Sequence, residues 1–118
     1  MLIAYSSFTG KVDKFVRKLG LPILRIQADT SIDEPFVMVT YTCGSGEVPE
    51  HVMRFLVNNR QHLRGVAASG SRNWPLFAYA ADRISDRFGV PLLHKFELAG
   101  RPSDVQYLLE RVKDLELH

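Results

Sequence analysis

Cysteine is almost absent from this 118-residue chain, which contains only Cys43. One cysteine cannot form an internal disulfide, so a packed core must hold the fold, as is usual in a reducing compartment. Long apolar stretches are also missing, because no run approaches the roughly 20 residues that span a bilayer. Residues 1–8 lack the basic segment of a secretory signal. We therefore expect a cytoplasmic protein that does not enter a membrane.

The chain also lacks a large excess of either positive or negative charge. The chain has 15 basic and 13 acidic residues, a net charge of +2. This balance gives no reason to expect a nucleic acid or a membrane surface as a partner. The histidines are scattered without the spacing of metal ligands, so no metal site is predicted. They are His51, His62, His94 and His118.

The period of the apolar residues changes several times along the chain, and its length suits one domain over residues 1–118. Short β-prone runs predict five strands, at residues 2–5, 22–26, 36–41, 66–68 and 92–98. Helical spacing between and after them predicts four helices. The order β-α-β-β-α-β-α-β-α indicates a parallel sheet with helices on both faces. We expect a three-layer α/β fold of the flavodoxin-like type, with strand order 2-1-3-4-5.

Four local signals predict where the helices begin and end. Gly20 is placed to end the first predicted helix, and Gly89 is placed to end the third. The third helix is expected to begin near Phe77. Pro49 is placed at the first position of the second helix. Ser103 or Asp104 is placed to cap the last one.

Three loops are richest in glycine, serine and threonine. They are "SSFTGKV" (residues 6–12), "TCGSGE" (residues 42–47) and "SGSRNW" (residues 69–74), and they follow the first, third and fourth predicted strands. The carboxyl ends of parallel strands meet at one edge of a sheet, where ligands of such folds bind. The sequence therefore predicts a ligand site formed by these loops.

The first of these loops has the composition of an anion site. Ser7, Thr9 and the backbone near Gly10 precede a predicted helix, where unpaired N–H groups attract negative charge. A phosphate monoester is the expected guest. The alternative is an ordinary helix cap with hydroxyl-mediated turns. Neither the P-loop pattern G-x-x-x-x-G-K-[ST] nor G-x-G-x-x-G is present.

The other two loops allow contacts with a planar ligand. Gly44 and Gly46 permit positive φ angles and a peptide that turns over, although a flexible connection would use the same residues. Trp74, near Gly70 and Asn73, is able to stack on a ring. The alternative for Trp74 is a core or edge position.

Two other functions of this fold class are excluded by residue type. A phosphorelay receiver needs acids after its first strand and an aspartate ending its third, where this chain has Ser6, Ser7 and Tyr41. A cysteine phosphatase needs C-x5-R, but Pro49 stands six residues after Cys43. Cys43 is interpreted as a small packing residue or a loop residue, without a redox role.

The loops together resemble a known family. "SSFTGKV" is similar to the flavodoxin phosphate loop, and "VTYTCGSGEVP", "RGVAASGSRNW" and "KFELAG" resemble NrdI, over about residues 2–112. NrdI proteins are small flavodoxin-like proteins of class Ib ribonucleotide reduction. The chain departs from the family pattern at Lys11, where an asparagine is common, and at Val12, where flavodoxins have threonine. It departs also at Pro75 and Leu76.

The resemblance implies an FMN cofactor. It assigns Ser7, Thr9 and Gly10 to the FMN phosphate, and it gives Gly44 the catalytic role of the glycine whose peptide responds to the flavin redox state. Thr42 to Ser45 would border the ring near N5, with Trp74 stacking on the other side. The implied cofactor-binding residues are Ser6, Ser7, Phe8, Thr9, Gly10, Lys11, Val12, Tyr41, Thr42, Cys43, Gly44, Ser45, Ser69, Gly70, Asn73 and Trp74.

The resemblance also implies a role as a redox-active accessory protein rather than an enzyme for a small substrate. Reduced FMN would react with O2 and supply superoxide to the dimanganese site of the class Ib ribonucleotide reductase small subunit, which then assembles its tyrosyl radical. An electron donor of unknown identity would reduce the flavin. Two alternatives stay open: a general electron-transfer flavodoxin, and an interaction module that does not bind flavin.

Overall fold

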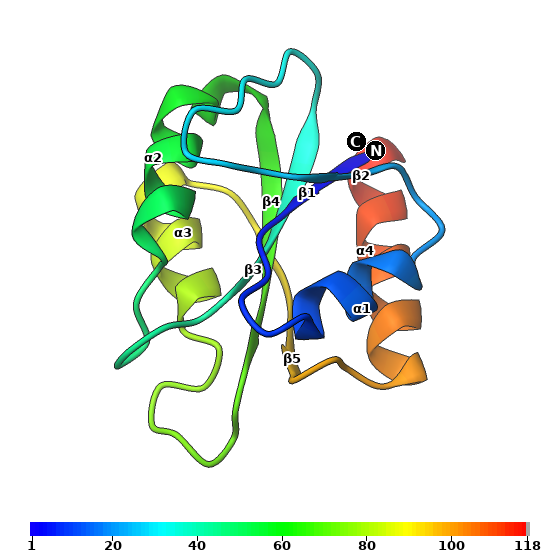
Figure 1. Cartoon of the computed structure of the whole chain (residues 1–118). Coiled ribbons are helices and arrows are strands. Elements are labelled where there is room, and N and C mark those ends of the chain that lie inside the picture. The colour runs from blue at the N-terminus through cyan, green and yellow to red at the C-terminus, as the bar shows by residue number, and fades with distance from the viewer. Residues whose placement is uncertain (118) are drawn as a thin grey trace.

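Five parallel strands form a single sheet with helices on both faces (Figure 1). This computed structural model describes residues 1–117, so His118 lies outside the described residues. The strands are β1 (Leu2–Tyr5), β2 (Ile23–Arg25), β3 (Phe36–Tyr41), β4 (Leu63–Gly70) and β5 (Leu92–Glu97). The helices are α1 (Lys11–Arg17), α2 (Glu50–Asn58), α3 (Ala80–Phe88) and α4 (Pro102–Leu117), with a short 3₁₀ turn at Arg60–His62.

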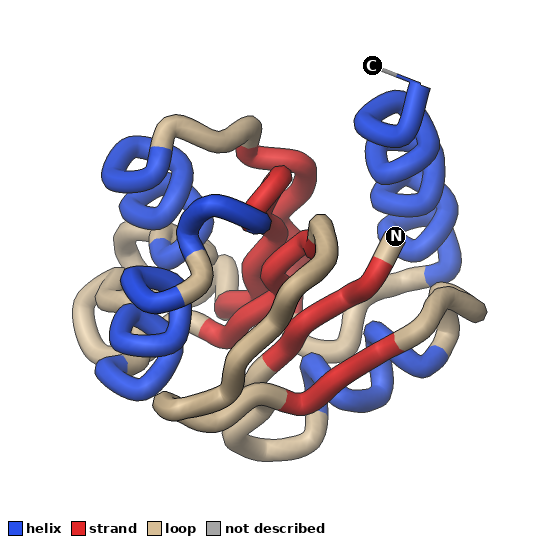
Figure 2. The backbone as a smooth tube through the Cα atoms, turned by 90° about the horizontal axis from the view of Figure 1, so that it is seen from above, coloured by secondary structure: helices blue, strands red, loops and turns tan. Residues whose placement is uncertain are grey.

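The strand order is β2-β1-β3-β4-β5, which confirms the predicted order and the flavodoxin-like fold class. Every neighbouring pair of strands is parallel. Helices α2 and α3 cover one face of the sheet, and α1 and α4 cover the other (Figure 1). The view in Figure 2 shows the strands between these two helical layers.

Alternation along the strands divides the core in two. Ile3 and Val37 point to one face and belong to a buried cluster with residues of α1 and α4. Ala4 and Met38 point to the other face and pack with residues of α2 and α3. Because both faces are covered, the central strands are buried on both sides, and this explains their continuous apolar runs. No helix in residues 1–117 has both the length and the apolar character needed to cross a membrane.

The fourth strand is longer than its apolar run predicts. Strand β4 extends from Leu63 to Gly70, because it pairs with β3 from Leu63 opposite Phe36 to Ser69 opposite Tyr41. Exposed Arg64 interrupts the apolar pattern, so the pattern alone missed the first residues of the strand.

Several predicted helix boundaries are displaced by one to three residues. Gly89 ends α3 in the left-handed conformation, as predicted, although that helix begins at Ala80 rather than near Phe77. Pro49 occupies the cap position of α2 with an extended backbone, not the first helical position. Helix α4 begins at Pro102, so the predicted caps at residues 103 and 104 lie inside its first turn.

Candidate functional site

A cavity of about 530 Å³ opens at the carboxyl ends of β1, β3 and β4. The three polar loops meet there, as expected for the ligand end of such a sheet. Its lining residues are Ser7, Phe8, Thr9, Lys11, Val12, Tyr41, Thr42, Gly44, Ser45, Gly46, Ser69, Gly70, Ser71, Trp74, Pro75, Leu76, Ala78 and Leu98. Most of the residues predicted for the site are therefore brought together around one space.

The predicted residues that are not among those lining residues have identifiable local roles. The Ser6 hydroxyl lies 2.6 Å from Nε2 of His51. Gly10 precedes α1 with a φ of 88°. Cys43 donates its thiol hydrogen to the carbonyl oxygen of Glu47 at 3.5 Å. Asn73 lies in an exposed turn.

The first loop is fixed at both ends by hydrogen bonds. Ser6 donates its N–H to the carbonyl oxygen of Val39, and the guanidinium of Arg25 donates to the carbonyl oxygen of Ser7 at 2.7 Å. The buried Ser7 hydroxyl accepts the N–H of Asp13 at 3.2 Å. Its own hydrogen stays free to donate to a ligand. Ser7 thus satisfies one N–H of the first turn of α1, whose cap position is Gly10, and is also a candidate ligand contact, so both interpretations of this loop involve the same residue.

Backbone donors between these anchors have no partner. Within residues 1–117, none of the N–H groups of residues 8–12 donates a hydrogen bond. Successive free N–H groups in a turn form a concave site that attracts anionic oxygens. Lys11 lines the same cavity and adds a positive charge. This end of the cavity fits a phosphate group.

The wall formed after β3 contains an unsatisfied hydroxyl. Thr42 lines the cavity, and its Oγ1 is buried without a hydrogen-bond partner in the described part of the chain. A buried hydroxyl without a partner costs about 1–3 kcal/mol. A polar atom of a bound ligand would remove this cost. The site therefore has unmet hydrogen-bonding capacity at Thr42 as well as in the first loop.

Beyond Thr42, the chain forms a tight hairpin. Cys43 and Glu47 exchange backbone hydrogen bonds of 3.0 and 2.7 Å. Gly44 and Gly46 between them have φ angles of 53° and 88°, which confirms that this turn uses the left-handed region. Burial, with a smaller contribution from the charge of Glu47, raises the pKa of the Cys43 thiol. The thiol is therefore held in its less reactive protonated form.

The third wall is a strained loop that folds back over the end of β4. Leu76 and Ala78 in this loop have positive φ angles, as does Leu98 directly after β5. These are the non-glycine residues of positive φ in residues 1–117, and all three line the cavity. Such conformations are costly for residues with a side chain and concentrate at functional sites. At Gly70, a Cβ atom would lie 2.5 Å from the backbone nitrogen of Ala78. The close approach of these segments requires glycine there.

Two exposed aromatic residues flank the cavity. Trp74 has 68% of its surface exposed and Phe8 has 80%, and both contribute to the lining. The Phe8 ring lies 5.8 Å from that of Tyr41. The exposure of Trp74 excludes a position in the core for this side chain. Exposed aromatic faces at a cavity mouth are suited to a planar ligand.

Six lining residues are absent from the set of cofactor-binding residues that the resemblance implies. They are Gly46, Ser71, Pro75, Leu76, Ala78 and Leu98. Leu98 had a usable signal, because it follows the fifth strand at the same edge of the sheet. Gly46 and Ser71 belong to two of the predicted loops, and Pro75 and Leu76 were named as departures from the family pattern. Ala78 had no signal, since it reaches the cavity only through the fold-back of its loop.

The fold is shared with solved flavodoxins. Oxidised flavodoxin 1 from Bacillus cereus is 19% identical, with 99% of this chain and 97% of that chain covered and a TM-score of 0.66. A short-chain flavodoxin associated with a non-canonical PDU bacterial microcompartment is 20% identical, with coverages of 98% and 95% and a TM-score of 0.69. Two-electron reduced flavodoxin from Megasphaera elsdenii is 16% identical, with coverages of 97% and 99% and a TM-score of 0.60.

The sequence also matches a family model described as "NrdI Flavodoxin like" over residues 3–110. This match spans most of the chain. The protein therefore belongs to the NrdI flavodoxin-like family, as its loops predicted.

Proposed function

We propose that this chain is an FMN-dependent accessory flavoprotein of class Ib ribonucleotide reductase. The observation that carries the proposal is the unmet hydrogen-bonding capacity of one cavity: the free N–H groups of residues 8–12 at one wall and the orphaned Thr42 hydroxyl at another. A ligand with a phosphate and a polar ring satisfies both. Family membership supports FMN as that ligand.

Each wall of the cavity has a separate task in this proposal. Ser7, Thr9 and the backbone around Gly10 hold the phosphate, with the Lys11 ammonium opposing its charge. Trp74 and Tyr41 flank the ring, and Thr42 offers it a hydrogen bond. Gly44 and Ser45 place a backbone peptide beside the ring, where the positive φ of Gly44 permits a change of orientation.

Reduced FMN, when bound, supplies the electron that converts O2 to superoxide, the oxidant for the dimanganese centre of the small subunit. The chain contributes binding, orientation and access. The exposed Trp74 and Phe8 leave the mouth of the cavity reachable for O2 and for a docked protein. The electron donor that reduces the flavin is of unknown identity. The single free thiol fits a cytoplasmic place of action.

A general electron-transfer flavodoxin is the competing function. The net charge of +2 favours the accessory role, because a flavodoxin that steers many redox partners relies on a strongly acidic surface. Both functions require FMN, so cofactor binding alone does not separate them. The protein partner with which the reduced flavin reacts separates the two functions.

The test has two stages. Titration of the purified protein with FMN, followed by flavin fluorescence and visible absorption, is expected to show saturable binding; no binding would overturn the proposal. The FMN-loaded protein is then mixed with the manganese-loaded small subunit of a class Ib reductase, reductant and O2. Tyrosyl radical formation that depends on this chain supports the proposal. Fast exchange with flavodoxin reductase and no effect on the small subunit would support the flavodoxin function.

A further inference from the structure

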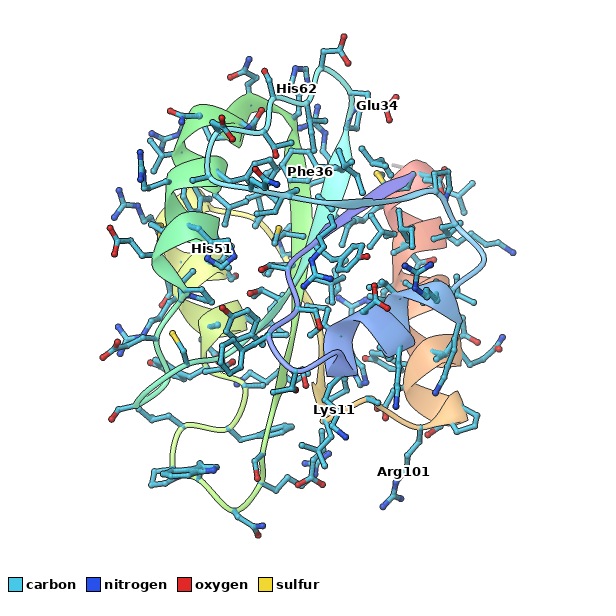
Figure 3. All side chains as sticks on the ribbon, viewed as in Figure 1. Lys11, Glu34, Phe36, His51, His62 and Arg101 are labelled. Atoms are coloured by element: carbon cyan, nitrogen blue, oxygen red, sulfur yellow. The ribbon has the colours of Figure 1, made fainter. Side chains whose placement is uncertain are left out.

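A second cavity of about 530 Å³ lies beside the first, between the start of α1 and the loop after β5. Lys11 and Leu98 line both cavities, so the two spaces adjoin each other. The labelled side chains of Lys11 and Arg101 project from the same end of the molecule (Figure 3). The second cavity is therefore next to the loop that we assign to the FMN phosphate.

The acids of this second cavity are already engaged. Glu97 accepts the N–H of Arg72 at 3.0 Å, and the guanidinium of Arg72 lies 3.7 Å from its other oxygen. Asp104 contacts Nε2 of His94 at 2.7 Å and accepts the backbone N–H of Arg101 at 2.7 Å. Glu97 is thus paired with a guanidinium, and both carboxylate oxygens of Asp104 have a partner within hydrogen-bond distance.

The cations are not engaged in the same way. Within residues 1–117, the side chains of Lys11 and Arg101 form neither an ion pair nor a hydrogen bond. Ser103, in the first turn of α4, adds a hydroxyl and a backbone N–H that donates no hydrogen bond in the described chain. Free donors and uncompensated positive charge in one cavity indicate an anionic ligand group.

We propose that this second cavity holds the second phosphate of a flavin dinucleotide, so that the chain accepts FAD as well as FMN. Because Lys11 borders both cavities, it is able to contact two phosphates joined through one oxygen. Arg101 and Ser103 contact the outer phosphate. The remaining volume takes the nucleoside, since a cavity of this size lies within the range of small-molecule sites.

The inference rests on the proposed FMN site, and the experiment separates the two. Wild-type protein is titrated with FMN and with FAD, each followed by flavin fluorescence. We expect dissociation constants for FAD and FMN within about tenfold of each other. Arg101→Gln is expected to weaken FAD binding by roughly fivefold at low salt and to leave FMN binding unchanged, because only FAD reaches that side chain.

Two further variants complete the design. Arg111→Gln removes the same charge from α4, the helix that directly follows Arg101. Arg111 contacts the hydroxyl and the ring of Tyr107 and does not line the second cavity, so this variant is expected to alter neither affinity. Ser103→Ala removes one donor and is expected to weaken FAD binding alone. FMN binding with FAD weaker by more than about 100-fold, or FAD affinity unchanged in both cavity variants, overturns the inference and leaves the proposed function intact. Failure of both flavins to bind overturns both.

Discussion

Arg83 on α3 donates a hydrogen bond of 2.7 Å from its Nε to the carbonyl oxygen of Gly46. This contact joins the hairpin after β3 to α3, the helix that follows the third loop of the cavity. The Arg83 guanidinium also lies 5.2 Å from the ring centroid of Tyr79, which fixes its direction. The position of the cavity wall at Gly44 and Ser45 thus depends on a residue that does not line the cavity.

We therefore expect Arg83→Gln to weaken FMN binding about twofold to tenfold, since a typical intramolecular hydrogen bond contributes roughly 0.5–1.5 kcal/mol net. Flavin fluorescence titration measures the affinity. Arg87→Gln on the same helix is the matched control, because Arg87 lies over the ring of Phe88 and away from the hairpin. Equal FMN affinities of the two variants would show that the hairpin keeps its position without Arg83.

Gly44 has a φ of 53°, and a Cβ placed there would meet only the flexible side chain of Glu47, at 3.3 Å. The obstacle to Gly44→Val is therefore backbone strain, about 1–2 kcal/mol for a left-handed residue with a side chain. We expect this variant to shift the reduction potentials of the bound flavin, measured by spectroelectrochemistry, because the peptide beside the ring loses an orientation.

The matched control is Gly20→Val. Gly20 has a φ of 70°, and a Cβ atom added there would meet open space, so the variant carries the same strain away from the cavity. It is expected to lower stability and leave the potentials unchanged. Identical potentials in Gly44→Val and wild type would mean that no reorientation occurs at this peptide.

Trp74 contributes an exposed ring to the mouth of the cavity. Trp74→Ala should weaken FMN binding by about 1 kcal/mol, the range of aromatic pairs. Tyr107→Ala, which removes a part-exposed aromatic ring from α4, serves as the control. FMN affinity unchanged by Trp74→Ala would rule out stacking at this position.

The sequence was sufficient for the strand order and for the three loops, because buried parallel strands have continuous apolar runs and the loops share an unusual composition. It was not sufficient for the positions of individual atoms. Ser6 and Ser7 are adjacent and alike in sequence, yet Ser6 faces His51 on α2 while Ser7 lines the cavity and accepts the N–H of Asp13 on α1. That difference depends on which face of the sheet each side chain meets.

The third loop shows a second limit of the sequence. The predicted helical stretch begins near Phe77, which places Ala78 inside the helix and Leu76 directly before it. In the structure both have positive φ, and the loop turns back to the cavity before the helix begins at Ala80. No local pattern marks a strained aliphatic residue, so only the packed structure reveals it.

Asp104 provides a prediction on pH. Burial would raise its pKa, but hydrogen bonds from His94 and from the Arg101 N–H, with the nearby charges of His94 and Arg72, hold the pKa below its ordinary value. A carboxyl whose folded pKa is depressed stabilises the fold above its unfolded pKa of about 3.9, and this contribution is lost as the pH falls through the folded value.

Asp104→Asn should therefore be less stable than wild type at pH 7, and the difference should shrink as the pH falls below about 4. Urea unfolding at a series of pH values measures it. Glu110→Gln, on the exposed side of the same helix, is the control. A difference between Asp104→Asn and wild type that stays constant down to about pH 2 would contradict the linkage.

Gly70 tests the close packing at the end of β4. A methyl group at this position would lie 2.5 Å from the backbone nitrogen and 2.9 Å from the Cα of Ala78, and backbone atoms cannot move aside as a side chain does. We expect Gly70→Ala to lower the free energy of unfolding by about 1–3 kcal/mol, the usual effect of overpacking. It should also weaken FMN binding, because the displaced loop is a wall of the cavity.

The control is Gly89→Ala. Gly89 has open space around its Cβ position and a φ of 65°, so this variant isolates the cost of a left-handed alanine, about 1 kcal/mol, without a clash. If FMN affinity falls equally in both variants, it follows global stability and not the position of the loop.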